Sequence, residues 1–198
     1  MREAAASVSN KLPIVLLLMS LCLNVVLVHR NKSLQSTIEE AEILQPGSHV
    51  SSLRFKSTSG AKVNISFPTQ AEGTLIYYFR PTCMWCMRNR ANFEILARKL
   101  QSLGYRILPY TLEHYPDQEY AKVLGQGVEV FTDDDQDVQR VLKLSGTPDT
   151  ILISRSGIVL AHWGGAFSDE NLRSIESRFG IHLPGLVLTP PPQKVSGN

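Results

Sequence analysis

Net charge is low in this sequence, and no segment repeats. The 198 residues carry 20 Lys and Arg against 18 Asp and Glu, which leaves a formal net charge of +2. The basic side chains are scattered rather than gathered into a stripe, so they form no surface that would attract a nucleic acid. We therefore exclude nucleic acid as a partner. Without its two ends the chain keeps about 135 residues, which is enough for one domain with a core.

Metal ligands are also few. Of the three cysteines, Cys22 lies in an apolar segment, so Cys83 and Cys86 are the only thiols outside it. A zinc site needs about four ligands. The five histidines stand singly, with no His-x3-His pair: His29, His49, His114, His162 and His182. The sequence therefore disfavours a zinc site, and we predict no bound metal.

A long apolar run near the start of the chain is the first positive feature. Residues 12–28, "LPIVLLLMSLCLNVVLV", contain no charge and approach the length that spans a hydrocarbon core of ~30 Å. No A-x-A-like cleavage site follows, and Leu21 is not the small residue that lipidation of Cys22 would require. We predict an uncleaved transmembrane anchor at 12–29, after a short segment 1–11. Cleavage and lipidation remain the alternatives.

The segments that flank the central part of the chain are of different kinds. Residues 30–46 place apolar side chains at helical spacing and end at a Pro-Gly pair, which predicts a helical stalk. Residues 183–198, "LPGLVLTPPPQKVSGN", are rich in proline and predict a flexible tail. Residues 47–182 between them form the predicted globular domain.

Strand-like and helix-like patterns alternate through this domain. Two runs around Gly60 predict a hairpin, and the continuous apolar run Thr74–Phe79 predicts a strand buried on both faces. A helix follows the cysteines. The later elements are expected as strand 105–110, helix 117–125, strand 128–131, helix 134–144, the hairpin strands 149–154 and 158–163, and helix 168–180. This alternation predicts a sheet with a parallel centre and antiparallel additions.

Helical spacing also predicts which side chains enter the core. The helix after the cysteines should bury Phe93, Leu96, Leu100 and Leu103 and end at Gly104. The closing helix should begin at Ser168, bury Leu172, Ile175 and Phe179, and end at Gly180. Pro109 removes a hydrogen-bond donor from its strand, so we expect that strand to fray there or to form a sheet edge.

Cys83 and Cys86 lie where the buried strand meets a helix. The first N–H groups of a helix lack internal partners and its dipole is positive there, so the pKa of Cys83 should fall below ~8.5. Cys86 lies one turn later on the same side, within disulfide reach. A disulfide that closes so short a loop would stabilise little. The pair therefore predicts a redox couple in which Cys83 attacks and a shielded Cys86 resolves.

A second motif lies about sixty residues later, at Gly146-Thr147-Pro148. A cis Thr147–Pro148 bond would place this turn beside the cysteines and leave the Thr147 backbone free to bind an extended peptide. A trans proline that starts the next strand is the alternative, since about one X–Pro bond in twenty is cis.

Taken together, the strand, the C-x-x-C pair, the helix and "GTPDTILISRSGIVL" resemble the thioredoxin-like superfamily over residues 46–179. The resemblance is greatest to the membrane-anchored redoxins, the TlpA, ResA and CcmG-like thiol–disulfide oxidoreductases, whose added hairpin resembles "LQPGSHVSSLRFKSTSGAKVNISF". It implies an α/β, thioredoxin-like three-layer sandwich with a mixed central sheet and an added N-terminal β-hairpin, preceded by one transmembrane helix. It also implies a cis Thr147–Pro148 bond.

The same resemblance implies a function. The chain would be a membrane-tethered thiol–disulfide oxidoreductase without a cofactor, with Cys83 and Cys86 catalytic and Thr147, Pro148 and Trp85 in contact with the substrate. Its partners would be a protein that carries a disulfide or a dithiol and an upstream thiol redox protein. The domain would stand on the periplasmic side of a bacterial inner membrane. Whether it reduces or oxidises its substrate stays open.

Three positions depart from the family pattern. Many members have tryptophan before the first cysteine and proline before the second, where this chain has Thr82 and Trp85. Thioredoxin has a buried aspartate six residues before the first cysteine, where this chain has Tyr77. The proton acceptor of Cys86 is therefore unassigned.

Two carboxylates are candidates for that acceptor. Glu113 follows a strand end and Asp149 adjoins Pro148, although a solvated loop carboxylate is the simpler interpretation of each. We interpret His162 and Trp163 as packing and surface residues.

Two other functions compete with disulfide exchange. A copper chaperone or a non-enzymatic assembly factor would use the two thiolates as a metal-holding or docking site, and Met84 and Met87 are further candidate ligands for copper. A peroxidase of the same fold would need a P-x-x-x-[ST]-x-x-C loop. The residues "RPTCMWC" do not supply that spacing.

Overall fold

The structure is a computed structural model that describes residues 3–42, 44–132 and 137–187. The chain divides into two compact units, the second of which begins at Leu44. The predicted tail lies mostly outside the described residues, and so does the start of the helix expected at 134–144.

The first unit is a single helix, α1 (Glu3–Glu42). It contains both the predicted anchor and most of the predicted stalk, so no break separates them. Within it, Pro13–Lys32 is long and apolar enough to cross a membrane, and none of its side chains is buried. A signal sequence would have the same properties, so the finding is one N-terminal apolar helix.

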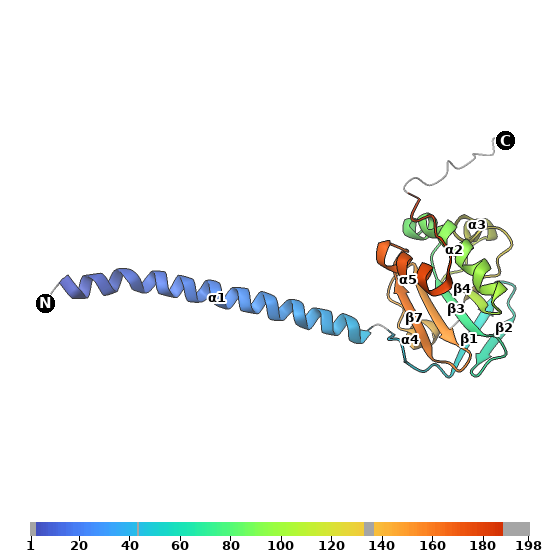
Figure 1. Cartoon of the computed structure of the whole chain (residues 1–198), viewed down its shortest axis with the longest axis horizontal. Coiled ribbons are helices and arrows are strands. Elements are labelled where there is room, and N and C mark those ends of the chain that lie inside the picture. The colour runs from blue at the N-terminus through green and yellow to red at the C-terminus, as the bar shows by residue number, and fades with distance from the viewer. Residues whose placement is uncertain (1–2, 43, 133–136, 188–198) are drawn as a thin grey trace. The chain divides into compact units, whose positions relative to one another are not determined.

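The second unit is a seven-stranded sheet with helices on both faces (Figure 1). Its strands lie in the order β2-β1-β5-β4-β3-β6-β7; β3, β4 and β5 are parallel, and the other pairs are antiparallel. The elements are β1 (Ser52–Ser57), β2 (Lys62–Ser66), β3 (Gly73–Tyr78), α2 (Met84–Ser102), β4 (Arg106–Tyr110), α3 (Asp117–Leu124), β5 (Phe131–Thr132), α4 (Asp137–Leu142), β6 (Asp149–Ser154), β7 (Val159–Gly164) and α5 (Asp169–Phe179). The predicted thioredoxin-like sandwich and the N-terminal hairpin are confirmed.

The central strand β3 is buried along its whole length, as predicted. It lies between β4 and β6, so both of its edges are paired and both of its faces are covered. Side chains alternate across a strand. Tyr77 therefore enters the core beneath α2 and α5, and Tyr78 enters the core on the opposite face, beside α4.

The helix α2 buries Phe93, Leu96 and Leu100, as predicted. The prediction for Leu103 is wrong, because the helix ends at Ser102 and Leu103 is its C-cap, 44% exposed. Gly104 follows with a φ of 82°, the left-handed conformation that glycine adopts most easily after a helix.

The closing helix α5 also follows its predicted pattern in most respects. Ile175 is fully buried, and Gly180 ends the helix in the left-handed conformation. Leu172 and Phe179 are half-buried against the core. Ser168 is the N-cap by position, although its side chain makes no capping hydrogen bond.

The strand β4 has a partly open edge at Pro109. Its parallel neighbour β5 has two residues and pairs with β4 at one position, Tyr110 with Phe131. The proline nitrogen therefore removes no ladder hydrogen bond on that side, although β4 is not an edge strand, because it lies between β5 and β3. The strand itself continues through Tyr110 without fraying.

Candidate redox site

Cys83 lies at the junction that the sequence predicted. It is the N-cap of α2, with extended backbone angles, and its Sγ accepts a hydrogen bond from the Cys86 N–H at 3.3 Å. This N–H is one of the first-turn donors that a helix leaves without an internal partner. The sulfur thus occupies the place that a serine or aspartate oxygen takes in other N-caps.

These contacts favour the ionised form of Cys83. The hydrogen bond from the Cys86 side chain lowers the pKa of Cys83 most; burial opposes it, and hydrogen bonds from Thr147 and from the Cys86 and Trp85 backbones add to it. The result is a pKa of about 5. At neutral pH the partly exposed Cys83 is therefore a thiolate.

Cys86 has the opposite environment. Its side chain is completely buried. Its hydrogen bond to Cys83 raises its pKa most, and burial raises it further. The two thiols are unbridged in this structure. One sulfur is exposed and ionised, and the second is buried and keeps its proton.

The Thr147–Pro148 bond is cis, as expected. The Thr147 carbonyl oxygen lies 3.3 Å from the Cys83 Sγ, so residues 64 positions apart meet at the site. Pro148 is buried, and its carbonyl oxygen accepts a hydrogen bond from the Gly165 N–H.

Apolar side chains are exposed beside the reactive sulfur. Met84 is 55% exposed and Trp85 is 52% exposed. The Arg88 guanidinium carbon lies 5.1 Å from the centre of the Trp85 ring, a cation–π contact. Arg88 is not named among the groups that shift the pKa of Cys83.

Asp149 and His162 form a buried pair that the sequence interpretation missed. His162 Nε2 lies 2.6 Å from Asp149 Oδ1, and both side chains are about 5% exposed. His162 Nδ1 contacts the Leu44 carbonyl oxygen. Asp149 is therefore no solvated loop carboxylate, and His162 is no surface residue, whereas Trp163 is buried as expected.

The missed pair had a weak sequence signal. Asp149 and His162 belong to the two strands of one predicted hairpin, so they could be neighbours on one face. A register shift between Leu152 and Ile153 decides which residues meet, and the sequence does not reveal it.

Tyr77, which replaces the thioredoxin aspartate, belongs to a buried network of neutral groups. The Asn89 side-chain amide donates to the Tyr77 hydroxyl at 3.4 Å, and the Asn92 amide donates to Asn89 Oδ1 at 3.1 Å. The two asparagine oxygens also accept the N–H groups of Phe167 and Gly185. The sequence interpretation missed both asparagines, which α2 buries among its apolar residues.

The two carboxylates considered as proton acceptors of Cys86 both bind other groups. Glu113 is exposed and accepts a hydrogen bond from the Tyr115 hydroxyl. Asp149 is bound to His162. Burial, and then the charge of Cys86, raise the pKa of Tyr77 well above its usual value, so Tyr77 accepts no proton near neutral pH.

The described residues contain no group of three or more His, Cys, Asp or Glu that could hold a metal ion. Met84 is exposed, and Met87 is half-buried and packs against the core. The predicted absence of a metal remains a prediction.

No family model matches the chain, and no curated protein sequence matches it. Several solved structures are similar to the chain at low sequence identity. The thioredoxin domain of a thiol-disulfide oxidoreductase from Bacteroides vulgatus is 16% identical with a TM-score of 0.54, and covers 69% of this chain and 99% of its own. A protein assigned as the thiol:disulfide interchange protein DsbE of Chlorobium tepidum is 18% identical with a TM-score of 0.56, covering 68% and 95%. The peroxidoxin BcpB of Mycobacterium tuberculosis is 12% identical with a TM-score of 0.54, covering 68% and 94%.

These similarities establish a thioredoxin-like fold for the second unit. The same fold carries thiol–disulfide exchange in one of these proteins and is named a peroxidoxin in another. The fold alone therefore does not select between the two chemistries. The choice depends on the residues of the site.

Proposed function

We propose that the chain is a membrane-tethered thiol–disulfide oxidoreductase that exchanges disulfides with protein partners through Cys83 and Cys86. One observation carries the proposal. A partly exposed sulfur with a lowered pKa caps a helix, and a buried thiol with a raised pKa lies one turn behind it. This arrangement suits a nucleophile and its resolving partner.

The first step is the attack of the Cys83 thiolate on a partner disulfide. A bond forms between Cys83 Sγ and one partner sulfur, the partner S–S bond breaks, and the other partner sulfur leaves as a thiolate. Before the attack, the Cys86 N–H donates to the charged Cys83 sulfur. Once the new S–S bond has formed, that sulfur no longer carries a charge.

The second step resolves the mixed disulfide. Cys86 loses its proton and attacks Cys83 Sγ, and the partner leaves as its second thiolate. Two electrons have then passed from the Cys83–Cys86 dithiol to the partner disulfide. An upstream thiol redox protein reduces the new disulfide; with an oxidising partner, the same steps run in reverse.

Thr147, Pro148 and Trp85 are the residues that we assign to partner binding. The Thr147 backbone lies beside the Cys83 sulfur, where an extended partner segment must pass. Trp85 offers exposed apolar surface on the helix side of the same sulfur, together with Met84.

We assign the domain to the extracytoplasmic side of a bacterial inner membrane, with α1 as a single-pass anchor. The length and apolar character of Pro13–Lys32 support an anchor. An oxidising compartment would also suit a dithiol that exchanges with disulfides. Protection of the domain from added protease in spheroplasts would place it in the cytoplasm instead.

The decisive experiment traps the mixed disulfide. Cys86→Ala should accumulate a covalent complex through Cys83 that thiol reductant releases and mass spectrometry identifies. Cys83→Ala is the matched control and should trap nothing. Failure of Cys86→Ala to trap any partner, together with failure of the native chain to reduce an insulin disulfide, would refute the proposal.

A second measurement separates exchange from the competing functions. Alkylation of the reduced chain by iodoacetamide should follow the ionisation of Cys83, with a midpoint near pH 5. A peroxidase would instead consume hydrogen peroxide through Cys83. A copper chaperone would bind one Cu(I) per chain and show no turnover with disulfides.

A further inference from the structure

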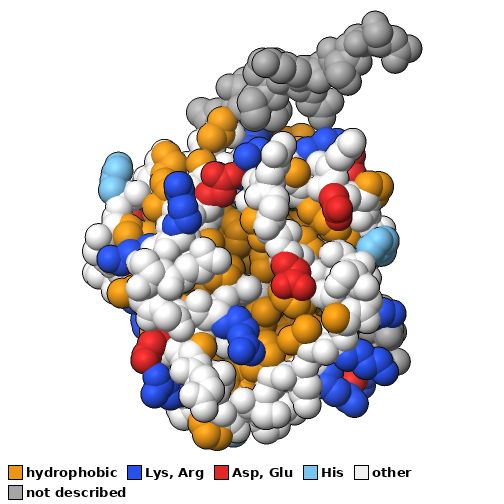
Figure 2. All heavy atoms as spheres, turned by 90° about the vertical axis from the view of Figure 1, so that its right-hand side faces the viewer, with side chains coloured by type: hydrophobic (Ala, Val, Ile, Leu, Met, Phe, Trp, Pro, Cys, Tyr) orange, Lys and Arg blue, Asp and Glu red, His pale blue; other side chains and the backbone are white. Residues whose placement is uncertain are grey.

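A large cavity lies away from the cysteines, between α2, the open edge of β4 and the loop that follows α3. Its volume is about 900 Å³. Figure 2 shows hydrophobic side chains filling a furrow on this face of the domain, with charged groups at its margins. We call this cavity the β4 groove and define it by Phe93, Arg98, Arg106, Ile107 and Glu129.

The floor of the β4 groove reaches the core. Phe93 of α2 and Leu124 of α3 are each 1% exposed, and both line the cavity. Half-buried Ile107 adds apolar surface from β4. A pocket of this size with apolar walls and a few polar groups is typical of a binding site.

Backbone groups of β4 face the cavity without a strand partner. The Tyr110 carbonyl oxygen accepts from Phe79 on the β3 side, whereas the Thr111 N–H donates to Phe131 on the β5 side. Because these directions alternate along a strand, Ile107 and Pro109 also face the β5 side. In the described part of the chain, β5 pairs with β4 at Tyr110 alone, so the Ile107 N–H and C=O have no ladder partner.

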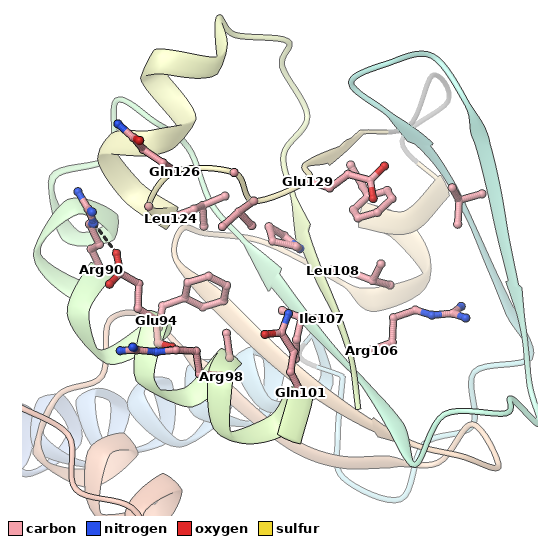
Figure 3. Close-up of a pocket in the computed structure, with 18 residues that line it drawn as sticks. Arg90, Glu94, Arg98, Gln101, Arg106, Ile107, Leu108, Leu124, Gln126 and Glu129 are labelled. Atoms are coloured by element: carbon pink, nitrogen blue, oxygen red, sulfur yellow. Dashed lines mark hydrogen bonds and ion pairs between the residues drawn. The ribbon is translucent and has the colours of Figure 1, made fainter. Parts of the chain in front are cut away.

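The charges around the β4 groove are predominantly positive. Three arginines and two glutamates line it (Figure 3). Arg90 is paired with Glu94 at 2.7 Å. Arg98 donates to the Glu94 backbone oxygen, and neither Arg98 nor Arg106 has an ion pair among the described residues. Glu129 is the one acidic side chain of the lining that lacks an ion pair within those residues.

We propose that the β4 groove binds an extended peptide segment of a partner protein, with apolar side chains at its centre and carboxylates at its ends. The segment adds a short strand to the open edge of β4, where Ile107 offers one donor and one acceptor. Its apolar side chains pack on half-buried Ile107, above Phe93 and Leu124. Its carboxylates meet Arg98 and Arg106. This binding does not depend on the proposed thiol chemistry.

The test uses the full chain in phosphatidylcholine nanodiscs and a fluorescein-labelled heptapeptide of alternating valine and threonine with aspartate at both ends. Fluorescence anisotropy should show saturable binding. A counterpart with lysine at both ends should bind at least about tenfold more weakly, because its charges oppose the arginines. Absence of saturable binding, or equal binding of the two peptides, overturns the proposal.

Variants locate the binding. Arg106→Glu and Arg98→Glu should each weaken the aspartate peptide about tenfold, and Glu129→Gln should strengthen its binding. Arg173→Glu on α5 is the matched control, since Arg173 is exposed and lies outside the groove. An equal loss with Arg173→Glu would show attraction by net charge alone and would refute the site.

N-methylation tests the backbone pairing. Methyl groups on alternate amides remove the donors from one edge of the peptide, and only one edge of an added strand faces β4. One of the two alternately methylated peptides should therefore bind at least about tenfold more weakly, and the other should bind like its parent. Equal affinity of the two methylated peptides would overturn the strand pairing. The groove would then recognise apolar and charged groups alone, such as those of the amphipathic acid dodecanoate.

Discussion

The two faces of the sheet hold different kinds of buried polar group beneath the candidate redox site. On the α2 face, Tyr77, Asn89 and Asn92 form a neutral network close to Cys86. On the opposite face, Asp149 and His162 form an ionisable pair beside Pro148. The buried carboxylate of this chain therefore lies on the face opposite Tyr77 and Cys86.

The placement of the carboxylate follows from strand register. Asp149 lies opposite Tyr78 in the antiparallel pair of β3 and β6, and Tyr78 belongs to the core on the α4 side. Tyr77, one residue earlier, points to the cysteines. One step along β3 therefore separates the environment of Cys86 from that of Asp149, the one strongly buried carboxylate of the described residues. The ionisable pair lies on the opposite face of the sheet from Tyr77 and Cys86.

The largest expected effect comes from breaking the ionisable pair. His162→Leu leaves the Asp149 carboxylate buried without its partner, so the free energy of unfolding should fall by ~3–5 kcal/mol. Urea denaturation followed by tryptophan fluorescence measures it, since both tryptophans lie in the second unit.

The double variant Asp149→Leu/His162→Leu is the control for that prediction. It removes both polar groups, so most of the lost stability should return. If the double variant were as unstable as His162→Leu, the loss would come from packing rather than from an uncompensated charge, and the comparison between the faces would fail.

Removing one member of the neutral network should also lower the free energy of unfolding, although no charge is left unpaired. Asn89→Ala removes the acceptor of the buried Phe167 N–H and a partner of both Tyr77 and Asn92. The free energy of unfolding should fall by ~2 kcal/mol. Asn64→Ala, at an exposed position of β2, is the control and should change it by less than ~0.5 kcal/mol. Equal effects would mean that the network contributes nothing specific.

Local and non-local features differ in how well the sequence predicts them. The sequence predicted the cysteine turn, α2 and the strand before it. The pattern of a helix N-terminus or of a buried strand depends only on residues that are consecutive in the sequence. The Asp149–His162 pair could not, because a shift at Leu152/Ile153 sets which residues meet. The asparagines of α2 were missed because their partners, the Phe167 and Gly185 N–H groups, lie in distant loops. The β4 groove also depends on the shortness of β5, which was expected over 128–131.

The ionisable face should also give stability a pH dependence. Burial lowers the pKa of His162 most, but the hydrogen bond and charge of Asp149, together with the Leu44 carbonyl, outweigh it, so the folded value lies above ~6.5. The stabilisation is therefore complete below pH ~6.5 and is lost as the pH rises through the folded pKa, by at most ~1.4 kcal/mol per pH unit.

The ionisation of Cys83 opposes this trend and has to be removed from the measurement. Its lowered pKa adds stability as the pH rises from about 5 towards the unfolded value of ~8.5. The comparison is therefore between Cys83→Ser and Cys83→Ser/His162→Asn. The first should lose unfolding free energy above pH ~6.5, and the second should not. Parallel pH profiles would contradict the assignment of the titration to His162.

The smallest expected effect tests whether the neutral face takes part in the thiol chemistry at all. Tyr77→Phe removes the acceptor of one Asn89 hydrogen bond, so the free energy of unfolding should fall by ~1 kcal/mol. The iodoacetamide midpoint of Cys83 should stay near pH 5, because Tyr77 is not among the groups that set that pKa. The release of the mixed disulfide, followed by quenched-flow mass spectrometry, should change by less than about twofold, because a hydroxyl that keeps its own proton cannot act as the base for Cys86. A much slower release would show that the Tyr77 hydroxyl assists Cys86, and the neutral face would then belong to the catalytic site rather than to the scaffold beneath it.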